Sequence, residues 1–420
     1  SGCSWGGENA RMFTLTEADD YHDHVPGTSH AHRVFEQPPS RSGWDIRRRR
    51  DLPADHAWVQ EFKRVPPWLA RGYNHDIFGL NRRSGELWDD WLRSDPEFFA
   101  SAHLRQDVLR LYEDPGHFEE ALVRQHQVGA TLAHYRPEQI RERWPTLAEA
   151  APDAFAGGIL VRGFTVNVHD FLRRLVEDLE ASGSHVRFDV RVTAVRRDGR
   201  DRVSGVQTTD GPYAARHYLI SPGVYGNDLL EGTLSDAQIH GVLGCWATVP
   251  DLGPSLENSL KVGRRGHIVE DANVTVAKDR EGRPILIVGS GYGWTGSDPT
   301  NIEQSELDAL HRGVADTIRR LFPRAYEAVG GEPGLRASQT FCVRPWTASN
   351  LGLFETVPAG SGVVVIADGH NTGGFAQAPV IAEAVLAAVQ GKHHPMHALY
   401  HPGRTDLALG RRVDVGQGVP

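Results

Sequence analysis

One arginine in this sequence stands where its side chain could bind an anion. Arg344 precedes Pro345 in CVRPWTASNLG, a stretch that is otherwise poor in charge. A guanidinium binds a carboxylate through two parallel hydrogen bonds, and its planar fork suits that geometry better than a lysine ammonium does. The other interpretation is an ion pair with a nearby Asp or Glu of the chain itself. From this residue alone, the ion pair is the favoured interpretation.

A second candidate site is a glycine-rich turn within residues 362–391. A continuous apolar run at 363–367 is typical of a strand buried on both faces. Pro379 is expected to open a helix that follows the turn. The backbone N–H groups and dipole of such a helix N-terminus bind anions, and glycines let a large flat cofactor approach the backbone. An ordinary strand–helix unit of a doubly wound sheet explains the pattern about equally well.

Histidines and arginines form three further clusters. His22, His24, His30 and His32 make two H-x-H pairs whose spacing could hold zinc. No cysteine or carboxylate pattern accompanies them, so a non-metal role is favoured and no metal site is predicted. The histidines at 393, 394 and 397 are expected to form a solvated tail, and the run DIRRRRD at 45–51 a solvated loop.

Composition limits the function classes. The 420 residues carry a formal charge of −9, which argues against a nucleic-acid partner. No apolar segment reaches the roughly 18–20 residues that span a bilayer, and no leader pattern is seen. Three cysteines, Cys3, Cys245 and Cys342, are too few for a disulfide framework, so a cytoplasmic location is expected. The length suffices for two substantial cores.

The elements that must position these residues are clearer in the second half of the chain. Residues 1–13 are predicted to be a loop and residues 14–66 mostly irregular. Helical patterning is seen at 86–94, 107–114 and 117–127, with another short helix at 137–147. A helix with one apolar face, from Phe171 to Leu179, is predicted to stop at Gly183.

Strands dominate the residues that follow. They are predicted at 185–195 and 202–211, and a buried one at 217–223 ends at Gly223. Residues 236–300 are strand-rich, and a long helix is predicted at 302–321 with Asn301 as its cap. Helix-rich and strand-rich segments thus alternate, which indicates two domains between which the chain crosses more than once.

With these residues in view, the chain resembles a known family. RPWTASNLGLFETV and GVVVIADGHNTGGFAQAP closely resemble the C-terminal signature of the D-amino-acid oxidase superfamily of FAD-dependent amine oxidoreductases. That group includes D-amino-acid dehydrogenases, glycine oxidase and sarcosine oxidase. Residues 164–195, 217–230 and 2–13 resemble, respectively, the family's helix and dinucleotide-contacting strand, its cofactor-side strand end and its flavin-side loop. The resemblance covers residues 1–13 and about 150–395.

The resemblance implies roles for individual residues. Arg344 would bind the substrate carboxylate. Cys342 aligns with the cysteine that, in sarcosine oxidases, bonds covalently to the flavin 8α-methyl; a small residue packing against the flavin explains it equally well. The implied cofactor is FAD, and the residues expected to contact it are Ser4, Trp5, Gly6, Gly7, Arg11, Val192, Gly223, Cys342, Gly369, His370, Asn371, Thr372, Gly373, Gly374 and Phe375.

The implied fold class is α/β, with a Rossmann-like FAD-binding domain interleaved with a substrate domain on a mostly antiparallel sheet. The predicted FAD-binding segments are 1–40, 151–235 and 336–400. The predicted substrate-binding segments are 41–150 and 236–335, and residues 401–420 form a tail.

Two departures from the family pattern stand out. The family's N-terminal unit of a strand and a GxGxxG turn is absent. GSGYGWTG at 289–296 spells this pattern at residues 291–296, but it lies in the predicted substrate-binding segment, where a strand-end turn explains it more simply. We therefore expect a fragment that lacks about 30–40 residues before Ser1, the span of one βαβ unit. Ile287 stands where sarcosine oxidases have a lysine that activates oxygen, which weakly favours a dehydrogenase over an oxidase.

The family implies a reaction in which the C–N bond of an amino acid or secondary amine is oxidised to an imine by hydride transfer to flavin N5. Electrons would pass to O2 or to another carrier. No acid–base residue is required if the amine arrives unprotonated. The alternative function is a non-catalytic partner subunit that has lost the dinucleotide site. The substrate and the oligomeric state stay open.

Overall fold

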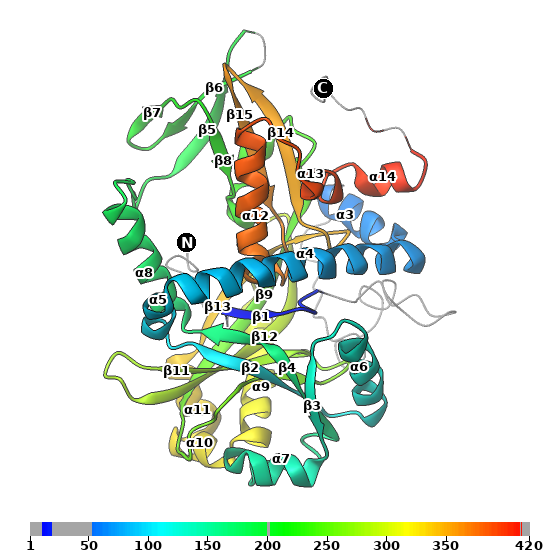
Figure 1. The fold of residues 1–420 in the computed structure, drawn as a ribbon, viewed down its shortest axis with the longest axis vertical. Helices are drawn as coiled ribbons and strands as arrows, with labels where there is room; N and C mark the ends of the chain where they lie inside the picture. The colour runs from blue at the N-terminus through cyan, green and yellow to red at the C-terminus, as the bar shows by residue number, and fades with distance from the viewer. Residues whose placement is uncertain (1–10, 19–52, 200–201, 412, 414–420) are drawn as a thin grey trace.

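A computed structural model describes residues 11–18, 53–199, 202–411 and 413 (Figure 1). The fold is mixed α/β, as predicted, and its largest part is a nine-stranded sheet that fills the lower half of Figure 1. The strands run in the order β1 (Arg11–Thr14), β4 (Gly157–Val166), β2 (Arg105–Tyr112), β10 (Ser259–Gly263), β11 (Ala272–Lys278), β12 (Pro284–Gly296), β9 (Ile239–Pro250) and β13 (Thr340–Thr347). β3 (Thr131–Tyr135) pairs with β4. Among the described strand pairs of this large sheet, only β2 and β10 run parallel.

Two three-stranded sheets complete the strand structure in the described residues. One runs β14 (Leu353–Ala359), β15 (Gly362–Asp368) and β8 (Tyr218–Ile220), in which β15 is antiparallel to β14 and parallel to β8. The other consists of β5 (Val192–Arg197), β6 (Val203–Thr208) and β7 (Gly211–Tyr213). Because β8 and β15 are parallel neighbours, the turns that follow them lie at the same edge of their sheet.

Helices cover these sheets. Towards the N-terminus they are α3 (Pro53–Arg64), α4 (Pro67–Ser94), α5 (Pro96–Ser101), α6 (Pro115–Gln127), α7 (Pro137–Arg143) and α8 (Val168–Ala181). Later helices are α9 (Gln304–Leu321), α10 (Pro323–Ala328), α11 (Gly331–Leu335), α12 (Gly374–Val389), α13 (Pro395–Leu399) and α14 (Arg404–Ala408). Short 3-10 turns lie at η1 (Pro145–Leu147), η2 (Gly223–Leu230) and η3 (Arg336–Ser338). No helix among them combines the length and apolarity needed to cross a membrane.

The large sheet presents two different faces. Odd-numbered residues of β9, such as Leu243 and Val249, share one core with the apolar side of α9, including Leu310 and Ile318. Even-numbered residues of β9 and β13 alternate to the opposite face, because successive strand residues point to opposite sides. That opposite face carries Arg344.

Several sequence predictions are confirmed. The helices predicted at 117–127, 137–147 and from Phe171 correspond to α6, α7 and α8, and residues 236–300 form β9 to β12. The predicted helix at 302–321 is α9, but its N-cap position is Glu303. Asn301 instead donates its side-chain N–H to the Thr295 carbonyl, so the predicted cap is wrong. The division of the chain into two domains remains a prediction.

Three predicted element types are wrong. Residues 11–14 are strand β1 and residues 53–64 are helix α3, where a loop and irregular chain were expected. Residues 107–114, expected to be helical, lie largely in β2. The last five residues of β2 are all buried. A short strand covered on both faces has no alternating pattern, so its period cannot be told from that of a helix.

The glycine-rich turn also differs from its prediction in detail. α12 begins at Gly374, so Pro379 lies inside the helix and does not open it. The proline removes one helical N–H, whose acceptor would be the Phe375 carbonyl in the first turn. The segment is anchored from outside, because Ser84 Oγ and Trp88 Nε1 of α4 both donate to the Ala376 carbonyl. Tertiary bonds thus support a helix start that a proline would otherwise weaken.

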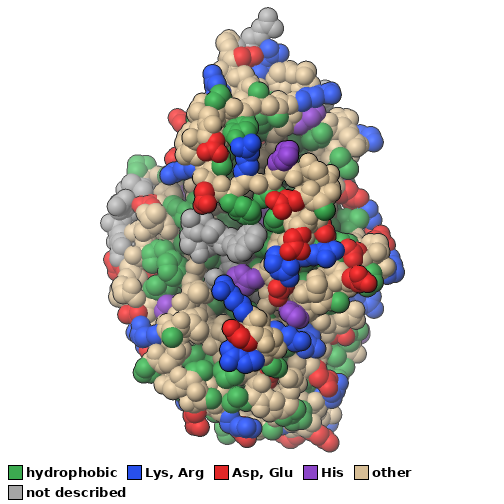
Figure 2. All heavy atoms as spheres, turned by 90° about the vertical axis from the view of Figure 1, so that its left-hand side faces the viewer, with side chains coloured by type: hydrophobic (Ala, Val, Ile, Leu, Met, Phe, Trp, Pro, Cys, Tyr) green, Lys and Arg blue, Asp and Glu red, His purple; other side chains and the backbone are tan. Residues whose placement is uncertain are grey.

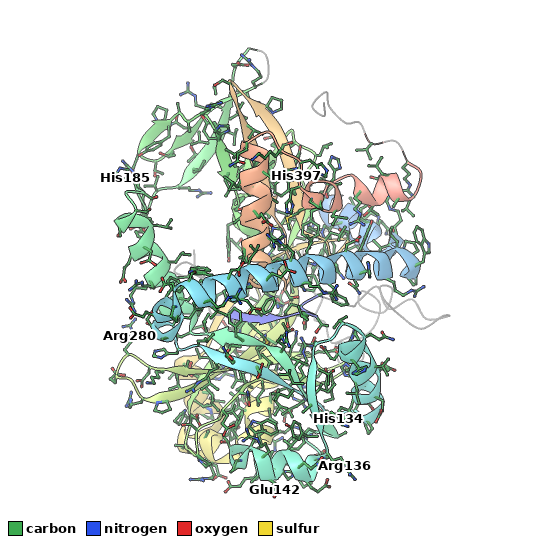
Figure 3. All side chains as sticks on the ribbon, in the orientation of Figure 1. His134, Arg136, Glu142, His185, Arg280 and His397 are labelled. Atoms are coloured by element: carbon green, nitrogen blue, oxygen red, sulfur yellow. The ribbon has the colours of Figure 1, made fainter. Side chains whose placement is uncertain are left out.

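Two predictions about exposure are also wrong. β8 was expected to be buried, but its central residue Leu219 is 56% exposed. The histidine-containing C-terminal segment was expected to be a solvated tail. His397 instead stacks on Phe354 with ring centroids 4.6 Å apart, and its Nε2 lies 2.9 Å from the Ala384 carbonyl oxygen. Figure 3 shows His397 beside α12 and the C-terminal helices, whereas His185 lies at the left-hand edge of the view. Residues 401–420 include helix α14.

Candidate functional site

Arg344 lies buried on β13, with its guanidinium over two aromatic rings. Its Cζ is 5.1 Å from the Tyr292 ring centroid and 6.0 Å from that of Trp346. The side chain donates to the carbonyl of Gly291 and, at 3.4 Å, to that of Val242. Among the described residues no Asp or Glu pairs with it, so the predicted alternative of an ion pair within the chain is not found there.

The surroundings of Arg344 are shaped to keep the guanidinium in place. Gly244 lies beside it on β9, where a Cβ would be 3.6 Å from Arg344 Cζ and 3.0 Å from the Trp246 ring. Burying a cation costs several kcal/mol unless a counter-charge or hydrogen bonds compensate it. Two carbonyls compensate only part of that cost. A buried cation of this kind is complementary to an anionic ligand.

A polar pair lies on the same face of the sheet. His240 of β9 is directly opposite Trp346 of β13, two residues along from the pair that contains Arg344. Nε2 of His240 lies 3.1 Å from Oδ1 of Asp55, and its ring packs against those of Trp58 and Trp294, with ring centroids 5.2 and 5.9 Å away.

Asp55 of α3 makes a second contact that fixes its carboxylate: Oδ1 accepts the Ser297 N–H at 2.8 Å. Burial alone would raise the pKa of Asp55, but the neighbouring His240 and the Ser297 N–H outweigh it and lower that pKa. Sequence reasoning missed this pair. Asp55 lies in a segment predicted to be irregular and His240 in one predicted only as strand, with no spacing that links them.

Two predicted cofactor residues, Gly223 and Gly369, are joined by a residue that was not predicted. Asp368, the last residue of β15, is 5% exposed. Its Oδ2 accepts the Gly223 N–H and its Oδ1 accepts the Gly369 N–H, each at 2.6 Å. Both glycines have positive φ, +62° and +66°. Burial raises the pKa of Asp368 to about 6, although the two N–H groups favour its charged form.

A cavity of about 320 Å³ lies next to the Gly223 turn. It brings the predicted cofactor residue Val192 together with the turn that begins at Gly223. A Cβ at Gly223 itself would meet nothing within 4 Å, so this turn borders open space. The lining residues are Arg191, Val192, Thr193, Pro222, Tyr225, Gly226, Asp228 and Leu229.

The remaining residues of the turn have different surroundings. The His370 ring lies 5.8 Å from that of Tyr400, and both of its nitrogens are buried; burial lowers its pKa to about 4, so the ring is neutral. Asn371 accepts the Thr347 N–H at 2.9 Å, which fixes the turn to the end of β13. Phe375 packs against Trp88, with ring centroids 5.1 Å apart.

The helix that follows the turn has a glycine at its N-cap. Gly373 occupies that position, and a Cβ there would lie 2.9 Å from Gln377 Nε2. Gly374 is the first helical residue, and Thr372 lies between Asn371 and this start. The N-cap residue itself therefore gives no side-chain bond to the first backbone N–H groups of α12.

The other predicted contacts are placed as follows. Cys342 lies buried on β13, two residues before Arg344 and on the same face of the sheet. Arg11 is the first residue of β1, opposite Val166. Ile287 lies in β12, and residues 289–296 continue that strand through a register shift. Ser4, Trp5, Gly6 and Gly7 lie outside the described residues, as do His22, His24, His30 and His32. Among the described residues no group of His, Cys, Asp and Glu is arranged to hold a metal ion.

Surface charge on the side of α8 is mixed. Figure 2 shows Lys and Arg side chains interspersed with Asp and Glu on that face, where exposed pairs such as Arg173–Glu177 lie at 2.9 Å. The described surface in this view has no continuous basic stripe of the kind that follows a nucleic-acid backbone.

Comparisons with known proteins agree with this arrangement. The chain matches the DAO family, described as FAD dependent oxidoreductase, over residues 46–388. A D-amino acid dehydrogenase from Bradyrhizobium diazoefficiens is 27% identical over 181 residues, which are 43% of this chain. That match spans only 39% of the relative's length.

Solved structures share the fold at low sequence identity. Glycine oxidase from Bacillus cereus ATCC 14579 has a TM-score of 0.56 at 14% identity, covering 76% of this chain and 82% of its own. L-proline dehydrogenase from P. horikoshii has a TM-score of 0.58 at 15% identity, covering 80% and 84%. Fructosamine oxidase from Aspergillus fumigatus in complex with FSA has a TM-score of 0.60 at 18% identity, covering 80% and 78%.

The residues fit the family's cofactor. Gly223 leaves space beside the cavity, α12 begins at two glycines that keep its N-terminus free of side-chain bulk, and Arg344 lies on the same sheet face as Cys342. The match covers more than half of the chain, and the resemblance seen in the sequence is confirmed. The chain therefore belongs to the DAO family of FAD-dependent oxidoreductases.

Proposed function

We propose that this protein oxidises the C–N bond of a small amino acid or related amine that carries a carboxylate, with FAD as the oxidant. One observation carries the proposal. Arg344 is a buried cation that no carboxylate neutralises among the described residues, and it lies on the strand that also holds Cys342. A substrate carboxylate would complete its coordination.

The chain's own groups have separable tasks. Arg344 binds the carboxylate and thereby orients the carbon that bears the nitrogen. FAD, when bound, would supply the two-electron oxidation that converts the C–N bond to C=N. The dipole of α12 favours negative charge beside its N-terminus. Trp346 and Tyr292 flank the guanidinium and exclude water, which strengthens its attraction to an anion.

Arg344→Gln tests this assignment. We expect KM for a carboxylate-bearing substrate to rise about 10²–10⁴-fold, because two charge-assisted hydrogen bonds contribute roughly 1.5–3 kcal/mol each. Arg344→Lys should recover part of the loss, since an ammonium keeps the charge without the planar fork. Flavin content, read from absorbance, should stay unchanged in both variants. Arg336→Gln is the matched control, because Arg336 is an exposed arginine already paired with Asp308.

The corresponding amine without a carboxylate is the discriminating substrate. Arg344→Gln should leave its turnover unchanged relative to the unmodified protein. Equal losses on both substrates would show that Arg344 holds the fold and not the carboxylate.

A second candidate function is a non-catalytic partner subunit. The observation that favours it is that the one GxGxxG match in the sequence, residues 291–296, lies inside strand β12 and not in a turn between a strand and a helix. Titration with FAD distinguishes the two functions, since a non-catalytic subunit would neither bind the flavin nor reduce it with any amine. Peroxide formation under air would then separate an oxidase from a dehydrogenase.

A further inference from the structure

Asp368 joins two turns that are far apart in the sequence. Its two carboxylate oxygens accept one backbone N–H each, from Gly223 after β8 and from Gly369 after β15. These strands are parallel neighbours, so both turns lie at the edge where ligands of open α/β sheets bind. Ser221 adds a further bond across the same two strands, from its hydroxyl to the Ala367 carbonyl.

The carboxylate occupies donors that would otherwise suit a phosphate. Backbone N–H groups at glycine turns commonly bind anions, and here the chain supplies the anion itself. Burial and the two N–H groups together set the pKa of the Asp368 carboxyl. Among the described residues, no charged side chain neutralises this carboxylate. A phosphate at the same two donors would meet an uncompensated like charge in a buried setting.

The two turns differ in the room that they leave. A Cβ at Gly369 would lie 2.7 Å from Thr347 Cγ2, so this turn is closed by β13. Gly223 has nothing within 4 Å of the same position and borders the 320 Å³ cavity through Pro222. Asp368 therefore fixes an open turn to a closed and well-anchored one.

We propose that Asp368 is a positioning residue for the cofactor: it fastens the Gly223 turn to the Gly369 turn and reserves their N–H groups. An uncharged part of FAD, and not its pyrophosphate, then contacts this pair of turns. The claim that an uncharged part of FAD contacts the turns rests on the proposed function. The fastening of the turns by Asp368 does not, because it is a property of the protein without flavin.

Hydrogen exchange of the flavin-free protein tests the fastening. Asp368→Asn keeps the shape, but its amide nitrogen cannot accept a hydrogen bond. At pH 8 we expect exchange at least 10-fold faster in peptides that contain Gly223 and Gly369. Glu355→Gln is the matched control: Glu355 is a buried carboxylate on β14 that accepts the Leu234 and Ser235 N–H groups at 3.0 and 2.9 Å. Its variant should change exchange near Ser235 only.

Inorganic pyrophosphate is the probe for the claim that Asp368 occupies the N–H donors. It should not protect the two turns of the unmodified protein from exchange, whereas in Asp368→Asn, with one donor released, it should slow exchange there at least threefold. FAD should bind Asp368→Asn at least 10-fold more weakly, as measured by flavin fluorescence. If the Asn variant does not fold, Asp368→Ser, which is neutral and shorter, takes its place and should also exchange faster than the unmodified protein.

An unchanged exchange rate at Gly223 in the folded Asn variant would refute the claim that Asp368 fastens the two turns together. Protection of these turns by pyrophosphate in the unmodified protein would refute the claim that Asp368 occupies their N–H donors. Failure of FAD to bind the unmodified protein would instead refute the proposed function, and the exchange experiment would still decide the role of Asp368.

Discussion

Alanine at Gly369 should destabilise the protein more than alanine at Gly223, although both glycines have nearly the same backbone conformation. Their φ angles are +66° and +62°. An L-residue in this region costs about 1–2 kcal/mol at either position. At Gly369 the new Cβ would also lie 2.7 Å from Thr347 Cγ2, whereas at Gly223 it would meet nothing within 4 Å.

The extra cost at Gly369 follows from how firmly its neighbour is held. Thr347 is 2% exposed, its hydroxyl donates to the Leu351 carbonyl at 2.5 Å and its backbone N–H donates to Asn371. It therefore cannot move aside freely. Overpacking of a buried site costs about 1–3 kcal/mol, so Gly369→Ala should lose about 2–5 kcal/mol of unfolding free energy. Gly223→Ala should lose about 1–2 kcal/mol.

Urea unfolding of both variants, with the slope of the transition compared, measures the difference. Thr347→Ser removes the clashing methyl and keeps the hydroxyl, so the double variant Gly369→Ala/Thr347→Ser should be more stable than additivity predicts by about 1–2 kcal/mol. Equal losses for the two alanine variants together with a strictly additive double variant would refute the close approach of the turn to β13.

Three further predictions concern buried charge and the flavin linkage. Burial raises the pKa of Asp368 from 3.8 to about 6, so ionisation of this carboxyl opposes folding. The free energy of unfolding should therefore fall by about 3 kcal/mol as the pH rises from 4 to 6. Urea titrations of Asp368→Asn should lack this dependence on pH. Glu17 is buried between Arg110 at 2.8 Å and Lys261 at 3.1 Å, which together outweigh burial and lower its pKa. Glu17→Gln should cost about 3–5 kcal/mol in the same assay, and a loss below 1 kcal/mol would mean that the cations reach solvent. If Cys342 carries the flavin, acid-precipitated flavin-loaded protein should be yellow and Cys342→Ser colourless; colourless pellets from both would exclude the covalent bond.

Local sequence determined the parts of the site that depend on neighbours along the chain. The apolar run at 363–367 and the glycines after it predicted a buried strand and a turn, and β15 and α12 are found there. Arg344 was identified because its segment is poor in charge. These signals are local, since strand burial and backbone freedom are read from residues a few positions apart.

Tertiary structure decided what those residues contact. Asp368 was visible in the sequence, but its partner Gly223 lies 145 positions away and became adjacent only through the parallel pairing of β15 with β8. Within the part of the chain that the structure describes, the lack of a carboxylate partner for Arg344 depends on which residues β9 and β12 bring next to β13. No local pattern encodes a register between distant strands.

The same reason explains the errors in secondary structure. β2 is covered on both faces by other elements, so it lacks the alternation that distinguishes a strand from a helix. The start of α12 lies before Pro379 because α4 anchors the Ala376 carbonyl. The sequence by itself determined the family, and it predicted the glycine-rich turn as a cofactor contact and Arg344 as an anion-binding residue. Packing between remote segments decided which charges are paired, since burial and pairing depend on contacts that form only when the chain is folded.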